Sequence, residues 1–589
     1  MKEFFKYMFA SMLGFVLVII IGSLIFFGIM VALISISSNQ EVSISGNSVL
    51  RLKLDRTILD RGTKSPAFLD LGNGAFAKRT GMDMILQNIG KAKEDPKIKG
   101  IFLDVGVIPA GISTITEIRD ALLDFKKSGK FILSYSEVYT QSSYYLASVS
   151  DQVYLHPQGI LFFKGLNAEM MFLKGALDKL DIKMQVIRHG KFKAATEPLF
   201  LDKMSPENRK QTMELISSVW GNVLEGISTS RNISVERLNR LADSLTVQSP
   251  EIALKNHLVD KLVYRDELIN ELRQKLGLTK KESINYVSLE KYDNVPELHK
   301  KMSDGHDRIA VIYAVGNIGG GEGDDQSIGS ERISKAIRKA REDEKVKAIV
   351  LRVNSPGGSS LASDVIWREV ALAVKEKPVV ASFGDVAASG GYYIACGASK
   401  ILADPTTITG SIGVFAVVPN FKGLMNNKLG ITFDNAKTNA NSDFIPVNEP
   451  LSPYQSIILQ REIENIYAAF VSRVADGRHL TTAQVDSIGQ GRVWSGTDAK
   501  KIGLIDDFGG LNKAIETAAG LAGIKKYHLV SLPEQKDVLE ELVEQFLGDK
   551  EESVLEKQLG ENYKYFKFLK ELREMKGIQA RLPFDINVN

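Results

Sequence analysis

The sequence AASGGYY, residues 387–393, follows a short apolar run at residues 378–383 (PVVASF). The pattern predicts a strand, a tight turn and the start of a helix. A nucleophilic serine needs this layout, because its hydroxyl must stand on a sharp turn and its small neighbours must let a substrate carbonyl approach. The alternative is that Ser389 caps the N-terminus of a helix, which is commoner for such a string. The stretch alone leaves both interpretations open.

A long internal repeat surrounds this stretch. Residues 91–101 (KAKEDPKIKGI) reappear 248 positions later as residues 339–349 (KAREDEKVKAI). Pro157 and Pro405 keep the same offset, so the register holds for more than sixty residues. We therefore expect two copies of one unit, each of about 220–250 residues, the upper end for a single domain.

Each copy alternates between strand and helix patterns. The first copy predicts helices over residues 82–94 and 114–127, and strands over residues 98–105 and 130–135. Later in each copy a long amphipathic helix is expected, through Trp220 and through Tyr467. This alternation indicates an α/β fold with a largely parallel sheet.

The two copies differ where a catalytic site would lie. At the same offset Ser389 corresponds to Gln141, and the Pro-Gly-Gly turn at residues 356–358 has no counterpart. A third turn, residues 409–413 (TGSIG), corresponds to residues 161–165 (LFFKG). A motif needed for packing would survive in both copies, because both must fold. Turns found only in the second copy therefore favour a site there, with Ser389 as its nucleophile.

A serine nucleophile needs a positioned base. No histidine lies in the strand and turn segments of the second copy, and His479 follows a long helix in an expected loop. A desolvated lysine is the alternative, because burial disfavours the ammonium form and lowers its pKa. Lys193 of the first copy has apolar neighbours within an otherwise charged segment. From the residues alone Lys191 or another lysine stays possible, and so does a surface position for Lys193.

The N-terminal region has the composition of a membrane segment. Residues 7–40 contain no charge, and residues 15–36 are almost wholly apolar. The apolar run exceeds the roughly 20 residues that span a bilayer, and it is longer than the apolar core of a secretory signal. Lysines precede it, so the positive-inside bias predicts a cytoplasmic N-terminus. We expect an uncleaved signal anchor rather than a buried core helix.

The overall composition excludes several other classes. The chain has 44% hydrophobic residues, 25% charged residues and a net charge of +3, which are ordinary values for a globular protein. No basic stripe with interleaved aromatic residues is present, which argues against nucleic-acid binding. One cysteine excludes an intrachain disulfide and a cysteine-rich zinc site, and the scattered histidines give no support for a metal. We predict no metal and no cofactor.

Several segments resemble the signal peptide peptidase A family, in its long tandem-repeat form. They are residues 352–359 (RVNSPGGS), 388–392 (ASGGY) and 408–413 (ITGSIG). Residues 190–198 (GKFKAATEP) resemble the segment that holds the family's general base. The motifs agree with the family in order and spacing, and the resemblance covers nearly the whole chain.

The resemblance implies a Clp-protease or crotonase-like fold in each repeat, and a membrane-anchored serine endopeptidase with a Ser-Lys dyad. Ser389 would be the nucleophile and Lys193 the general base. Backbone N–H groups of Gly358 and Gly390 would form the oxyanion hole, and Ser411 would orient the lysine.

The substrates implied are cleaved signal peptides and other apolar peptides, degraded through an acyl-enzyme. The resemblance also implies a homotetramer at a lipid bilayer, with the catalytic part on the periplasmic side of a bacterial inner membrane. Four regions are expected: an anchor (1–40), a first α/β repeat that supplies the lysine (41–300), a second α/β repeat that supplies the serine (301–526), and a helical C-terminal extension (527–589) with helices at 538–547 and 562–575.

Two other functions are compatible with parts of the sequence. A crotonase-like acyl-CoA enzyme would suit the oxyanion turn, but a domain outside the cytoplasm would not meet CoA. A non-catalytic membrane scaffold built from two degenerate copies would place Ser389 and Lys193 far apart.

Overall fold

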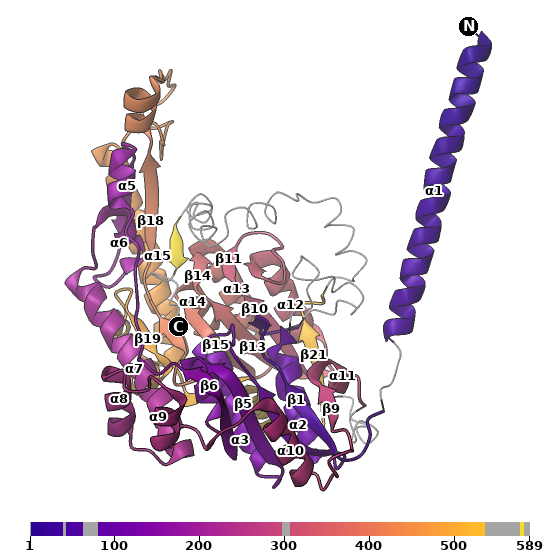
Figure 1. Cartoon of the computed structure of the whole chain (residues 1–589). Coiled ribbons are helices and arrows are strands. Elements are labelled where there is room, and N and C mark those ends of the chain that lie inside the picture. Colours follow the sequence, from indigo (N-terminus) through magenta and orange to yellow (C-terminus); the bar gives the residue numbers. More distant parts are fainter. Residues whose placement is uncertain (1, 39–42, 63–79, 297–306, 536–577, 582–589) are drawn as a thin grey trace.

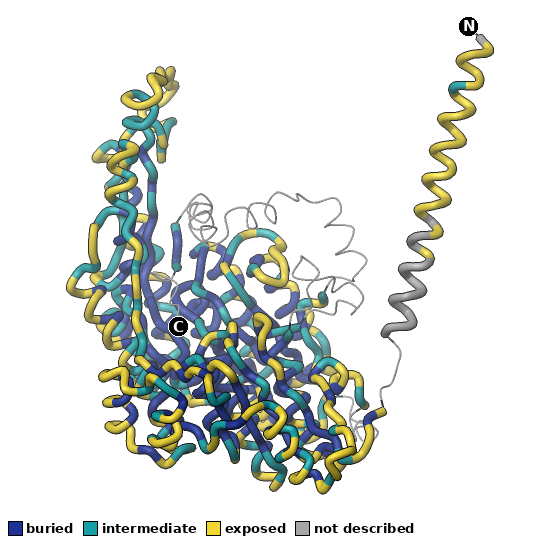
Figure 2. Tube along the Cα trace, in the orientation of Figure 1, coloured by how far each residue is buried: buried dark blue, intermediate teal, exposed yellow. Residues whose placement is uncertain are grey.

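The computed structural model describes residues 2–38, 43–62, 80–296, 307–535 and 578–581 (Figure 1). Its first element, α1 (Lys2–Ser38), is a helix of 37 residues that projects away from the rest of the molecule. Residues 3–23 are long and apolar enough to cross a membrane, as an anchor or as a signal sequence. This span is not buried against the protein, and its side chains are almost all exposed (Figure 2).

The first repeat forms a six-stranded sheet in which all neighbouring strands run parallel. Its order is β8-β6-β5-β4-β1-β9. The inner strands are near-continuous apolar runs, as expected when both faces of a parallel sheet are covered. The strands are β1 (Ser48–Leu52), β4 (Ile98–Asp104), β5 (Phe131–Tyr139), β6 (Gln152–Leu161), β8 (Lys261–Leu262) and β9 (Asn285–Ser288).

The second repeat forms an eight-stranded sheet whose main path is β19-β17-β15-β13-β10-β21. The strands on this path run parallel except β19, which is antiparallel to β17. They are β10 (Arg308–Val315), β13 (Val346–Ser355), β15 (Val379–Ala388), β17 (Ile408–Gly410), β19 (Val493–Ser495) and β21 (His528–Leu532).

The predicted duplication is confirmed element by element. In the first repeat α2 (Met82–Glu94), β4, α3 (Ile112–Lys126) and β5 begin 248 residues before α12 (Ser330–Glu342), β13, α13 (Ser360–Ala373) and β15. The long helices are α7 (Pro206–Arg231) and α15 (Pro453–Arg478), and each begins after a serine whose side chain caps it. The fold is therefore two tandem α/β repeats that follow an N-terminal apolar helix.

A third sheet joins the two repeats. Its order is β12-β11-β14-β22-β18-β7, and β7 (Lys183–Arg188) of the first repeat pairs antiparallel with β18 (Phe415–Asn420) of the second. The remaining strands are β11 (Asn317–Gly319), β12 (Ser327–Gly329), β14 (Gly357–Ser359) and β22 (Gln579–Arg581). Because Lys193 follows β7 closely, this pairing brings a segment of the first repeat to the second.

The C-terminal extension differs from the expected helical region where it is described. Its described elements are strands, β21 and β22, and each completes a sheet with residues far away in sequence. The helices expected at 538–547 and 562–575 lie outside the described residues. Strand pairing over such distances leaves no local pattern in the sequence.

Candidate active site

Ser389 stands at the turn between β15 and α14 (Gly390–Ala395). Its backbone has φ 55° and ψ −114°, an unusual conformation for a residue with a side chain. Its N–H donates to the Gly410 carbonyl (2.8 Å), which helps to hold the turn. The Ser389 side chain makes no capping hydrogen bond to α14, so the capping interpretation is wrong.

The glycines beside Ser389 are required by close packing. A Cβ atom on Gly390 would lie 2.7 Å from Ser363 Oγ, and one on Gly391 would lie 2.6 Å from the Ser355 carbonyl oxygen. Larger side chains would therefore push β13 and α13 away from the turn.

Lys193 reaches Ser389 from the first repeat. Its Nζ lies 2.9 Å from Ser389 Oγ, 3.0 Å from Ser411 Oγ and 3.2 Å from the Ser411 carbonyl oxygen. The whole side chain is buried, and this desolvation lowers the pKa of Lys193 well below its usual value. The surroundings therefore favour the neutral amine, the form that can accept a proton.

A turn of the second repeat fixes the position of Lys193. Gly491 has φ +77°, and a Cβ atom there would lie 2.6 Å from Lys193 Cβ. The neighbouring Gln490 carbonyl accepts a hydrogen bond from the Phe192 N–H (2.9 Å). The sequence does not reveal this contact, because no motif connects residues 490–491 to a lysine of the other repeat.

The Pro-Gly-Gly turn packs against the residues beside Ser389: a Cβ atom on Gly357 would lie 2.7 Å from the Gly390 nitrogen. Gly357 has φ +102° and Gly358 has φ +156°, values at which a side chain would be strained. The Gly357 N–H donates to Ser355 Oγ (3.1 Å), a contact that was not predicted. The five residues expected at the site, Lys193, Gly358, Ser389, Gly390 and Ser411, are thus brought together by the two repeats.

A strand from the C-terminal region lies along this turn. β22, the short yellow strand in Figure 1, pairs antiparallel with β14, with Ala580 opposite Gly358, and it also pairs with β18. The carbonyl oxygen of Ala580 is 3.1 Å from the position of a Cβ on Gly390. The N–H and the hydroxyl of Ser360 both donate to the Ile578 carbonyl, at 3.3 and 3.1 Å. The turn beside Ser389 therefore pairs with an extended backbone.

Other candidate groups do not join this cluster. His189 stacks on Tyr467 with ring centroids 3.7 Å apart, and its Nδ1 lies 2.7 Å from Glu464. In the part of the chain that is described, no group of three or more His, Cys, Asp or Glu side chains could hold a metal ion. The scaffold hypothesis, which separated Ser389 from Lys193, does not agree with their 2.9 Å contact.

Residues 124–279 and 371–525 each match Peptidase family S49. The chain belongs to this family. Lys193 lies within the first S49 match and Ser389 within the second. The duplication seen in the fold is thus a duplication of the S49 domain, and the chain is a serine protease of the tandem-repeat type.

Several relatives match this chain over most of their length. "Protease 4" of Salmonella typhi is 37% identical over 526 residues, which cover 87% of this chain and 84% of that protein. "Protease 4" of Haemophilus influenzae is 35% identical, and the match covers 84% of this chain and 82% of that protein. "Serine protease SPPA, chloroplastic" of Arabidopsis thaliana is 33% identical, and the match covers 86% of this chain and 75% of that protein.

Solved structures similar to the S49 chain are more distant. A mutant of ClpP1 from Listeria monocytogenes has 16% identity and a TM-score of 0.25, over 37% of this chain and 99% of that one. The second structure is a mutant of the 1510-N membrane-bound stomatin-specific protease in complex with a substrate peptide. It has 16% identity and a TM-score of 0.27, and the match covers 41% of this chain and 97% of that one. At these scores the structures add nothing to the family assignment.

Proposed function

We propose that the protein is a membrane-anchored endopeptidase with a Ser389-Lys193 dyad, which degrades cleaved signal peptides through an acyl-enzyme. The observation that supports this most directly is the 2.9 Å contact between a buried lysine amine and the hydroxyl of a serine on a strained turn. Membership of Peptidase family S49 supplies the reaction class, which is peptide hydrolysis by a serine protease.

The proposed reaction begins with proton transfer. Neutral Lys193 takes the proton of the Ser389 hydroxyl while Oγ adds to the scissile carbonyl carbon. The resulting oxyanion accepts hydrogen bonds from the N–H groups of Gly358 and Gly390, each worth about 3 kcal/mol in comparable sites. The C–N bond then breaks, the leaving amine takes the proton from Lys193, and the acyl group stays on Ser389. Water, deprotonated by Lys193, hydrolyses this ester and restores both residues.

Ser411 is proposed to position the lysine. Both its hydroxyl and its carbonyl oxygen lie within hydrogen-bond reach of Nζ. These two neutral acceptors hold two N–H bonds of the amine, so that its lone pair can face Ser389 Oγ. Ser411→Ala is expected to lower kcat more than it raises KM, because it disturbs the base rather than the peptide cleft.

The substrate is proposed to bind as an extended strand between β14 and β18. The place that β22 takes beside Gly358 supports this, because a backbone ladder recognises peptides independently of side-chain identity. Signal peptides are apolar segments released at a membrane, and α1 provides an apolar helix long enough to hold the protease there.

The proposed topology has a cytoplasmic N-terminus and a catalytic region on the periplasmic side of a bacterial inner membrane. The homotetramer that we propose is supported by an arm that extends from the body at residues 421–450 (Figure 1). Exposed apolar side chains gather on this arm, and burial between copies would remove them from water: Leu429, Ile431, Phe433, Phe444, Ile445 and Val447.

Two substitutions test the dyad in the purified full-length protein. With a synthetic signal peptide as substrate, Ser389→Ala and Lys193→Ala are each expected to lower kcat/KM by about 10³-fold or more. Lys191→Ala is the matched control, since Lys191 is exposed and lies two positions away. Intact-mass analysis of the wild type with an activated ester should show acylation, and Ser389→Ala should not. Full activity in either dyad variant would contradict the assignment.

A further inference from the structure

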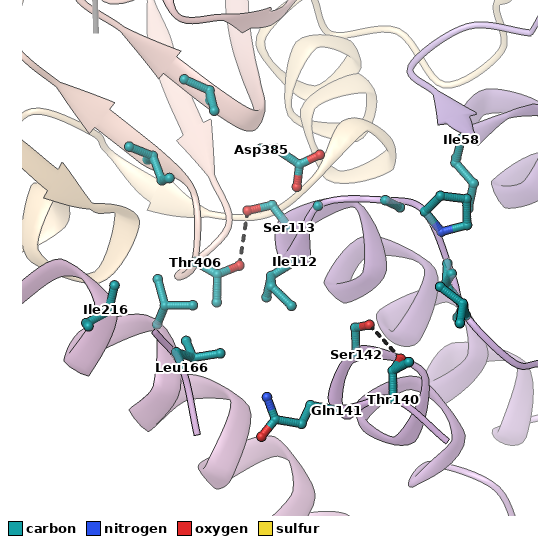
Figure 3. A pocket seen from close by; sticks show the side chains of 18 of the residues that line it. Ile58, Ile112, Ser113, Thr140, Gln141, Ser142, Leu166, Ile216, Asp385 and Thr406 are labelled. Carbon is teal, nitrogen blue, oxygen red and sulfur yellow. Dashed lines mark hydrogen bonds between the residues drawn. The ribbon is translucent and has the colours of Figure 1, made fainter. Parts of the chain in front are cut away.

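A cavity of about 680 Å³ lies in the first repeat, at the position that corresponds to the active site of the second. Figure 3 shows this cavity with residues from both repeats around it. At the offset of 248 residues, Pro109, Ala110 and Gly111 in its wall correspond to residues 357–359. Gln141, also in its wall, corresponds to Ser389.

This cavity has lost the groups that catalysis needs. The Gln141 side chain bonds only backbone groups of its own repeat: its Oε1 accepts from the N–H groups of Lys164 (2.7 Å) and Gly165 (2.6 Å), and its Nε2 donates to the Gly165 carbonyl (2.9 Å). At the turn, Pro109 has no N–H and the Ala110 N–H donates to the Ile108 carbonyl (3.0 Å). No nucleophile remains at the position of Ser389, and the N–H at the position of Gly358 is already engaged within its own repeat.

The space itself has been kept, and its wall is mainly apolar. Side chains from the turn, from α7 and from the loop after β6 line it, among them Ile112, Leu166, Ile216 and Phe162. Asp385 is the acidic side chain in the wall, and it already accepts hydrogen bonds from the Thr114 N–H (3.0 Å) and hydroxyl (2.6 Å). An apolar ligand therefore fits the cavity better than a cation or a hydrophilic one.

Two strands that line the cavity, β15 and β17, also lead to the proposed catalytic residues. Val386 of β15 and Ile408 of β17 line it, and the same strands lead to Ser389 and Ser411. Three residues of extended strand separate Val386 from Ser389, which is about 10 Å. Along β15, the wall of the cavity is therefore only a few residues away from the proposed nucleophile.

We propose that this cavity is a non-catalytic subsite, which binds an apolar segment of the peptide substrate while Ser389 cleaves another part of it. The inference rests on the proposed function. A peptide is the occupant we infer because the equivalent turn of the second repeat pairs with an extended backbone, β22. Without a ladder donor at Pro109, the first repeat would bind the side chains of such a peptide rather than its backbone.

Two cavity-filling substitutions test the subsite. Ile216→Trp on α7 and Ala110→Phe on the turn are compared with Leu254→Trp, an exposed position on α9 (Pro250–Lys255) that does not line the cavity. Each variant is assayed with a five-residue peptide ester and with a 20-residue apolar peptide that contains the same cleavage sequence. The quantity compared is the kcat/KM for the long substrate divided by that for the short one.

We expect this ratio to fall at least fivefold in both filled variants, mainly through a higher KM for the long peptide, and to stay within twofold in Leu254→Trp. An unchanged ratio in the filled variants would overturn the subsite. Misfolding would lower the activity on both substrates without changing the ratio. If both filled variants behave in this way, the result also counts against the subsite. The short ester reports the dyad separately, so failure of the proposed function would show there.

A binding measurement separates a peptide from a lipid occupant. Ser389→Ala protein is titrated with the 20-residue peptide carrying an environment-sensitive fluorophore, and then with myristate. Filling the cavity should weaken peptide binding at least fivefold. If Ile216→Trp weakens the binding of myristate alone, the peptide subsite is wrong.

Discussion

Lys193 illustrates how the surroundings of a residue favour a protonation state that its type does not normally have. A lysine in water is protonated at neutral pH, but complete burial next to neutral oxygens disfavours the ammonium form. The short apolar context of residues 192–195 indicated this burial. The contacts with Ser411 and Gly491 were less accessible to sequence reasoning, because these residues lie more than 200 positions away.

The lowered pKa of Lys193 predicts the pH dependence of the enzyme. Because the proposed base would act in its neutral form, kcat/KM should rise with pH through the pKa of Lys193 in the free enzyme and then level off. The inflection should lie well below 10.5, the usual lysine value, since burial lowers this pKa. Initial rates with a short, uncharged peptide ester between pH 5 and 11, corrected for spontaneous hydrolysis, would measure it. An activity that rises only near pH 10.5 would mean that Lys193 is charged in the working enzyme.

Among the elements, α2, β4, α3 and β5 were predictable because each is encoded by a local periodicity of apolar residues. Their observed bounds lie within a few residues of the expected ones. β7, β14, β18 and β22 were not predictable in the same way. They are short, and their partners come from distant segments, so their stability depends on pairing rather than on local propensity.

β22 predicts that the chain's own C-terminal region competes with substrate. Removal of residues 578–589 should raise kcat/KM for a short peptide, mainly by lowering KM, because it frees the edge of β14. If β22 contributes about 1.4 kcal/mol of effective binding, the increase is about tenfold. Removal of residues 582–589 alone is the control, since it leaves β22 in place. Equal activity of the two truncated proteins would show that β22 does not compete.

At the scale of the whole molecule, the duplication explains why one site needs both repeats. The first repeat retains the fold and the lysine, and the second retains the serine and the glycine turns. Self-comparison of the sequence predicts the two copies and their differences. How they dock does not follow from it, because the interface depends on buried contacts between segments that have no shared motif.

Arg352 makes such a contact and leads to a prediction for stability. It is fully buried in β13, where Nε lies 2.6 Å from Asp60 and Nη2 lies 2.6 Å from Glu117, both in the first repeat. Arg352→Met would leave two buried carboxylates without their cation, which should destabilise the protein by about 3–5 kcal/mol. Lys335→Met, which breaks the exposed pair with Glu322, should change the stability far less, because solvent screens that pair. Urea unfolding of both variants, followed by tryptophan fluorescence, would compare them. Similar urea midpoints for the two variants would mean that Arg352 does not hold the two repeats together. In that case the peptidase activity should also survive Arg352→Met.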